Sequence, residues 1–112
     1  MRLITLNGVK LLVYRNGMIL RYFPKNTNYY NQGWNELKGS IGNNGYKFIR
    51  INKKGFYRHR IVAYAFLGLN INDPTAQIDH IDGNPLNDSM NNLRIVSNQE
   101  NQFNRNGKGY DF

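Results

Sequence analysis

The order of hydrophobic and polar positions predicts short strands in the first half of the chain. Residues 9–14 and 18–23 are rich in apolar and β-forming side chains, and Asn16-Gly17 lies between them. Asn-Gly between two such runs indicates a hairpin, because both central positions of the usual turn need positive φ. Residues 24–35 are polar, aromatic and rich in turn formers, and they predict a loop.

A further strand is predicted at 46–52, with a turn at 53–55 after it. Tyr46, Phe48 and Arg50 would share one face of this strand, because successive side chains alternate between faces. Aromatic and basic residues on one face could dock against a nucleic-acid groove. They could equally form a packing ladder between strands, with the arginine in solvent.

The clearest helix is predicted at 58–67, and Gly68 supplies its C-terminal stop. Four apolar residues recur at helical spacing and predict a single stripe that faces the core: Ile61, Val62, Ala65 and Phe66. Residues 69–77 then form a connector.

The second half of the chain predicts a strand, a long loop, a strand and a helix. The two strands fall at 78–81 and 93–96, and the polar segment 82–92 joins them. Residues 97–100 read Ser-Asn-Gln-Glu, which is the capping-box pattern, so a helix is predicted from there to about residue 105.

Charge is distributed unevenly along the 112 residues, a length that suits one small domain. The net charge is +8, but residues 1–68 carry +11 and residues 69–112 carry −3. This asymmetry favours a half that binds a polyanion, followed by a half that bears carboxylates. The alternative is a basic surface that is simply solvated.

Several classes of protein are disfavoured by composition. The chain has no cysteine and two histidines, so neither disulfides nor a zinc site is expected. No run approaches the roughly 18 apolar residues of a membrane span, and the N-terminus has no signal-peptide layout. We therefore expect an intracellular, cytoplasmic protein without a membrane partner.

Asp79-His80 is the most informative pair of residues, together with Asn92 and Asn101 further along the chain. A carboxylate and an amide oxygen can hold a hard cation, and a neutral imidazole can accept a proton from water. Taken singly, the pair could be an ordinary turn, Asn92 could stabilise a loop and Asn101 could be an exposed helix residue. The presence of all of them, at these spacings in one predicted ββα pattern, favours a functional role over these structural ones.

These segments together resemble the HNH endonucleases, and most closely the homing and phage-type subgroup. The resemblance rests on His59-Arg60-Ile61-Val62-Ala63-Tyr64-Ala65-Phe66, Ile78-Asp79-His80-Ile81-Asp82-Gly83-Asn84, Asn87-Asp88, Asn91-Asn92-Leu93-Arg94 and Ser97-Asn98-Gln99-Glu100-Asn101. It implies an α+β fold with a small β-rich N-terminal region, a connecting helix and a C-terminal ββα-metal motif. Residues 1–57 would form the basic DNA-binding region, and residues 58–112 the connecting helix and nuclease unit, with both parts in one compact domain.

The resemblance also implies roles for four residues. Asp79 and Asn101 would bind one divalent cation, Mg²⁺ or alternatively Mn²⁺, and His80 would be the general base. Asn92 would hold the loop and thereby orient His80. The expected activity is hydrolysis of DNA phosphodiesters, leaving 5′-phosphate and 3′-hydroxyl ends. Asn101 stands where the name-giving pattern has histidine, which favours Mg²⁺ over tightly bound zinc.

Double-stranded DNA is the expected partner, bound by a monomer or a homodimer. The residues predicted to contact DNA are all basic: Lys47, Arg50, Lys53, Lys54, Arg58, Arg60 and Arg94. His59 is expected to have a structural role at the helix start, with a phosphate contact as the alternative. The competing functions are a non-catalytic DNA-binding or packaging-accessory module that keeps this frame, and a structural RNA-binding domain.

Overall fold

Nine strands, one α-helix and one 3₁₀ helix form in the residues that the computed structural model describes, which are 1–24 and 32–96. The first sheet is antiparallel and contains β1 (Arg2–Leu6), β2 (Val9–Val13), β3 (Ile19–Phe23) and β4 (Gly33–Glu36), in that order. The second contains β5 (Ser40–Ile41), β6 (Lys47–Ile51) and β7 (Lys54–Tyr57). The third pairs β8 (Gln77–His80) with β9 (Leu93–Val96).

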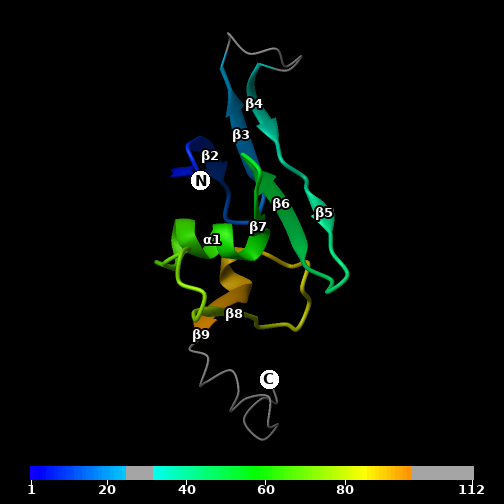
Figure 1. Ribbon diagram of the computed structural model, residues 1–112. Coiled ribbons are helices and arrows are strands. Elements are labelled where there is room, and N and C mark those ends of the chain that lie inside the picture. Colours follow the sequence, from blue (N-terminus) through cyan, green and yellow to red (C-terminus); the bar gives the residue numbers. More distant parts are fainter. Residues whose placement is uncertain (25–31, 97–112) are drawn as a thin grey trace, which may run out of the picture.

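The helix α1 (Arg58–Phe66) lies between the third sheet and the other two (Figure 1). It contacts strands from all three sheets and the 3₁₀ helix η1 (Met90–Asn92). The helix predicted at 58–67 is therefore confirmed, and it ends one residue earlier. Gly68 has a φ of 77°, so the predicted stop uses the conformation that glycine adopts most readily. None of the helices in the described ranges is long and apolar enough to cross a membrane.

The predicted hairpin between β2 and β3 forms, but its turn differs from the expectation. Gly17 has a φ of 97°, whereas Asn16 is not among the residues with positive φ. The Gly17 amide donates to the Tyr14 carbonyl (3.0 Å), and the Tyr14 amide donates to the Met18 carbonyl (2.9 Å). This is a longer loop that ends in one left-handed glycine. The expectation of positive φ at both positions was wrong here.

Two-residue turns with positive φ at both positions do occur elsewhere in the first two sheets. Asn7 and Gly8, between β1 and β2, have φ values of 48° and 79°. Asn52 and Lys53, between β6 and β7, have values of 48° and 69°. The turn predicted at 53–55 is thus shifted by one residue, and Lys54 already belongs to β7. These turns match the right-handed twist of the strands that they join.

Part of the predicted loop at 24–35 is a strand, which corrects the sequence-based expectation. Gly33–Glu36 pairs with β3 as β4, and Trp34 lies opposite Tyr22 in the register. Their ring centroids are 5.2 Å apart. A cross-strand aromatic pair of this kind stabilises the pairing of β4 with β3. The local sequence of residues 32–36 does not by itself predict a strand.

One hydrophobic core joins the β-rich region to the helix. Its buried members come from β1, β2, β3, β6, β7, α1 and β9: Leu6, Val9, Leu11, Val13, Ile19, Ile49, Ile51, Phe56, Ile61, Val62, Ala65 and Leu93. Full burial of a Val, Leu or Ile side chain contributes about 1.5–3 kcal/mol. Core residues come from both sides of the boundary expected at residue 57, so the two parts of the chain share one core.

Most of the elements in the described residues are strands and one is an α-helix, so the fold is richer in β-structure than the predicted α+β class. The strands predicted at 78–81 and 93–96 form as β8 and β9, shifted by one residue in the first case. The helix predicted at 97–105 lies outside the described residues.

Replacing Gly39 with alanine is expected to destabilise the protein by about 1–3 kcal/mol. Gly39 has a φ of 65°, and a Cβ atom there would lie 2.4 Å from the Phe48 carbonyl oxygen. Gly33→Ala is the matched control, because Gly33 has a φ of 89° with nothing within 4 Å. Urea unfolding of both variants should show the larger loss for Gly39→Ala; equal losses would contradict the close approach.

Candidate active site

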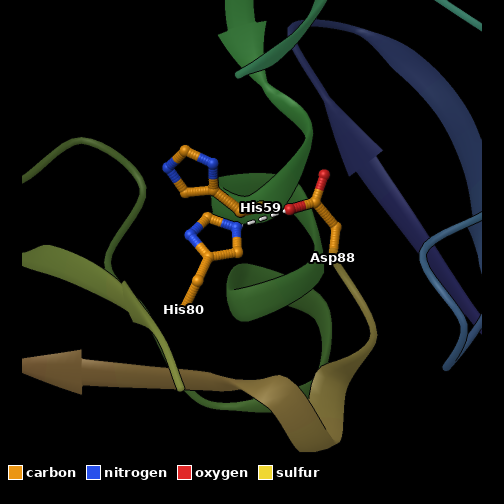
Figure 2. Close-up of side chains that lie close together, drawn as sticks. All are labelled: His59, His80 and Asp88. Carbon is orange, nitrogen blue, oxygen red and sulfur yellow. Dashed lines mark hydrogen bonds and ion pairs between the residues drawn. The ribbon is translucent and has the colours of Figure 1, made fainter. Parts of the chain in front are cut away.

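Two histidines and an aspartate from separate elements converge in the interior of the protein (Figure 2). His59 lies in the first turn of α1, His80 ends β8, and Asp88 lies in the loop before η1. Their potential ligand atoms are all within 4.8 Å of one another. The three residues are buried, with 7%, 8% and 1% of their surfaces exposed. The fold thus concentrates imidazole and carboxylate groups in an interior position.

Asp88 is held from two sides by charged or polar donors. Its Oδ1 atom is 2.7 Å from His80 Nε2, and its Oδ2 atom accepts a hydrogen bond from Arg58 Nε at 2.7 Å. Burial raises the pKa of Asp88, but the hydrogen bonds from His80 and Arg58 outweigh it and leave that pKa below its usual range. Asp88 is therefore a carboxylate, which accepts hydrogen bonds only.

The loop that carries Asp88 is supported by the turn between β2 and β3. The Met90 amide donates to the Arg15 carbonyl at 2.8 Å. A Cβ atom on Gly17 would lie 3.1 Å from the Asp88 carbonyl oxygen. The glycine of the hairpin turn therefore allows the two backbones to approach. The turn fixes the position of the Asp88 loop relative to the first sheet.

Aromatic rings surround the two histidines. Tyr46 stacks on His80 with centroids 5.7 Å apart, and Tyr57 stacks on His59 at 5.3 Å with an interplanar angle of 10°. The two imidazoles meet edge to face at 5.0 Å. These contacts restrict both rings and remove water from around them.

His59 is held in its neutral form. Burial, followed by the charge of His80, lowers the pKa of His59 from 6.5 to about 4. Its Nδ1 atom is buried without a hydrogen-bond partner, and Arg21 Nε is the other such side-chain atom in the described part of the chain. A buried imidazole nitrogen without a partner is uncommon in native proteins.

Acidification is expected to destabilise the protein between pH 6.5 and about 4 because of His59. In this window the unfolded chain binds a proton at His59 that the folded protein does not bind, so stability falls as the pH falls. The difference corresponds to about 3 kcal/mol. Urea unfolding at about pH 7.5 and about pH 4.5 should show the loss, and His59→Phe should remove most of it. An equal loss in both proteins would contradict the prediction.

Asp79 faces away from this cluster and pairs with Arg94. The two residues are partners in the β8–β9 register, and Arg94 Nη2 donates to Asp79 Oδ2 at 2.5 Å. Asp79 is buried, whereas the Arg94 side chain is 42% exposed. Adjacent residues of a strand point to opposite faces, which separates Asp79 from His80. The structure therefore does not bring the Asp79 carboxylate into the histidine cluster.

Asn92 closes the loop between β8 and β9. Its Nδ2 atom donates to Asp82 Oδ1 (2.8 Å) and to the Asn87 carbonyl (2.9 Å). Its Oδ1 atom accepts from the Asp82 amide (3.0 Å), and its carbonyl accepts from the Ile81 amide (2.8 Å). These four bonds fix the ends of the loop that carries Asp88. Asn101, the other predicted ligand, lies outside the described residues.

The basic residues predicted to contact DNA divide into two groups. Three of them are tied to the protein: Arg58 to Asp88 and Leu86, Arg60 to the carbonyls of Ala76 and Asp73, and Arg94 to Asp79. The other four lie on the β6–β7 hairpin. Among these, Arg50, Lys53 and Lys54 are exposed and Lys47 is partly buried.

The roles of Asp88 and Arg58 in holding His80 were not predicted from the sequence. Asp88 lies eight residues after His80, in a loop whose conformation the local sequence does not fix. The signal that could have identified it is the acidic residue next to Asn87, which is one of two acids, with Asp82, in an amide-rich loop. The convergence of His59 on the same cluster depends on the packing of α1 against β8, and no local pattern predicts it.

Comparison with known proteins adds three findings. Residues 56–103 match the sequence model of a family described as HNH endonuclease. Protein 3.8 of Escherichia phage T7 is 63% identical over 27 residues, which are 24% of this chain and 22% of that protein. The structure is also similar to the HNH homing endonuclease I-HmuI, solved in a study of DNA binding and cleavage. That match has a TM-score of 0.64 and 28% identity, and it covers 97% of this chain and 60% of that one.

Proposed function

Since the chain belongs to the HNH endonuclease family through residues 56–103, we propose that it is a metal-dependent DNA endonuclease of the homing or phage type. The observation that carries this proposal is the buried hydrogen bond between His80 and the Asp88 carboxylate. The chain spans 60% of the length of the homing endonuclease that it resembles. DNA cleavage is therefore proposed from the residues of this chain's own candidate site.

His80 is the proposed general base. Asp88 is ionised and accepts hydrogen bonds only, so His80 Nε2 carries the proton that lies between them. Nδ1 then holds the lone pair that can take a proton from the attacking water. Asp88 acts through His80 as a positioning residue, and Arg58 in turn fixes Asp88.

Asp79 and Asn101 are the proposed ligands for one divalent cation. A carboxylate and an amide supply oxygen donors, which suit Mg²⁺ or Mn²⁺. In the structure the Arg94 side chain neutralises the Asp79 carboxylate. The Arg94 side chain is half-exposed, so it can move away from the carboxylate when a cation approaches. When bound, a cation there supplies charge stabilisation to the phosphate and to its leaving oxygen. The proposed products carry 5′-phosphate and 3′-hydroxyl ends.

The exposed β6–β7 hairpin is the proposed DNA-contacting element. Arg50, Lys53 and Lys54 are exposed on it, and Tyr46 at its start stacks on His80. Lysine and arginine contacts to phosphates position a protein on the duplex without reading its sequence. The hairpin would therefore hold the duplex through its phosphates.

Incubation of supercoiled plasmid with the protein tests the proposal. With Mg²⁺ or Mn²⁺, nicked or linear DNA should accumulate, and EDTA should stop the reaction. Labelling the new ends with kinase and with terminal transferase would identify the terminal groups. Absence of cleavage with either cation, under conditions where the DNA is bound, would contradict the proposal.

One observation favours a second candidate, a DNA-binding module that does not cleave. The Asp79 carboxylate is already paired with Arg94, as it would be in a frame that no longer binds a cation. This candidate predicts that fluorescence anisotropy detects binding to duplex DNA while the plasmid stays supercoiled. A structural RNA-binding domain would instead retain RNA in preference to DNA.

A further inference from the structure

We propose that His59, His80 and Asp88 form a second cation site, selective for a borderline metal such as Zn²⁺, and that occupation of this site switches off the general base. The binding part of the proposal concerns these three side chains alone. The regulatory part rests on the proposed nuclease function. Titration with Co²⁺ tests the binding part, and plasmid cleavage in the presence of Zn²⁺ tests the regulatory part.

The three groups are assembled by the fold and are held in place before any cation binds. They come from α1, β8 and the loop before η1, and their ligand atoms lie within 4.8 Å of one another (Figure 2). Tyr57 stacks on His59 and Tyr46 stacks on His80. Arg58 binds Oδ2 of Asp88, which turns Oδ1 toward the imidazoles. Such outer contacts orient metal ligands in known sites.

The unpaired Nδ1 atom of His59 is an independent sign of a ligand. His59 is 93% buried, since 7% of its surface is exposed. Its Nδ1 atom has no hydrogen-bond partner. A buried polar atom without a partner calls for a water or an ion.

The donor set indicates the class of cation. Two imidazoles and one carboxylate match sites for zinc and related transition metals, with a fourth position left for water. Magnesium prefers oxygen donors and binds such a set poorly. Asp79, the proposed magnesium ligand among the described residues, is not part of this set, because it pairs with Arg94 on the other side of β8.

Occupation of this site would remove the lone pair that the proposed mechanism needs. A neutral imidazole has one nitrogen with a lone pair and one that carries a proton. A cation between His80 Nε2 and Asp88 takes the lone pair of Nε2, so the proton resides on Nδ1. His80 can then no longer accept a proton from water at Nδ1. Zinc would therefore inhibit a reaction that magnesium supports.

Binding is tested on the full chain without a purification tag, in the absence of magnesium. Titration with Co²⁺ should produce a saturable visible absorption band at one ion per chain, and Zn²⁺ should abolish it. His59→Phe keeps a ring against Tyr57 but lacks the nitrogen atoms, and it should weaken Zn²⁺ binding by more than about 100-fold, since even outer partners contribute roughly 10–100-fold. Glu36→Gln removes an exposed carboxylate from β4 and should bind normally.

Each outcome of the titration decides the binding part. A band in the wild type and in Glu36→Gln that disappears in His59→Phe supports the site, provided that thermal melting shows His59→Phe to be folded. If His59→Phe does not fold, His59→Gln replaces it. No band, or a band unchanged in the folded His59 variant, overturns the site.

Regulation is tested by adding Zn²⁺ to plasmid cleavage at constant Mg²⁺. We expect Zn²⁺ to inhibit the wild type and Glu36→Gln, whereas the cleavage rate of His59→Phe, measured relative to its own rate in Mg²⁺ alone, should resist Zn²⁺. Equal inhibition of all three proteins overturns the regulatory part. If no protein cleaves DNA, the proposed function fails, whereas the Co²⁺ titration still decides whether the cation site exists.

Discussion

Replacing His80 with alanine or glutamine is expected to lower the rate of Mg²⁺-dependent DNA cleavage by about 10²–10⁴-fold. Either variant lacks a nitrogen that can accept the proton of the attacking water. Glutamine is the sharper test, because its amide can still donate a hydrogen bond to Asp88 and so preserve that contact. Single-turnover cleavage of a labelled duplex would measure the rate.

DNA binding should be almost unchanged in both variants, because His80 is buried and carries no surface charge that attracts phosphate. Fluorescence anisotropy at a fixed salt concentration provides this control, and circular dichroism shows that the variants are folded. Glu36→Gln, in the first sheet, controls for the effect of any substitution. Wild-type cleavage by His80→Gln would exclude His80 as the base.

Replacing Asp88 with alanine is expected to reduce the free energy of unfolding by about 3 kcal/mol, which is the lower end of the range for breaking a buried ion pair. The lower end applies because the Arg58 side chain is 22% exposed and can reach water, although His80 Nε2 would lose its buried acceptor. For a domain of this size the melting temperature should fall by roughly 15 °C. Urea unfolding and calorimetry measure the two quantities.

A double variant separates the ion pair from the packing. Arg58→Ala combined with Asp88→Ala should lose less stability than the sum of the two single losses, since neither charge is then left without its partner. Glu36→Gln should stay within about 0.5 kcal/mol of the wild type. Additive losses in the double variant would show that Arg58 and Asp88 contribute independently.

Local sequence predicted the elements whose signals are confined to a few neighbouring residues. Helix α1 was predictable from the spacing of Ile61, Val62 and Ala65, which are all buried. Strands β8 and β9 followed from short apolar runs around a polar loop. Strands β1, β4 and β5 were not predicted. The residues of β4 become a strand through pairing with β3, as Trp34 does with Tyr22. Trp34 and Tyr22 are twelve residues apart, which is beyond a local pattern. Strand β1, in contrast, pairs with β2 across Asn7-Gly8, a local hairpin signal that could have predicted it.

The candidate site shows the same division. Asn92 was predicted to hold the loop, and its bonds to Asp82 and Asn87 are local ones that span at most ten residues. The roles of Asp79, His80 and Asn101 in catalysis stay predictions. Asp88 and His59 were missed as partners of His80, because the cluster exists only after α1 packs against β8. A sequence pattern can name a residue type, but it cannot show which carboxylate reaches which imidazole.

The support that Arg15 and Gly17 give to the Asp88 loop has a consequence for modularity. The backbone bond from Met90 to Arg15, and the close approach of Gly17 to Asp88, connect the first hairpin directly to the cluster. We infer that a fragment beginning at residue 58 would lack the platform on which Asp88 is placed. Recombination between related proteins, natural or engineered, would preserve the His80–Asp88 pair only when the β2–β3 hairpin and the segment from β8 to β9 are inherited together.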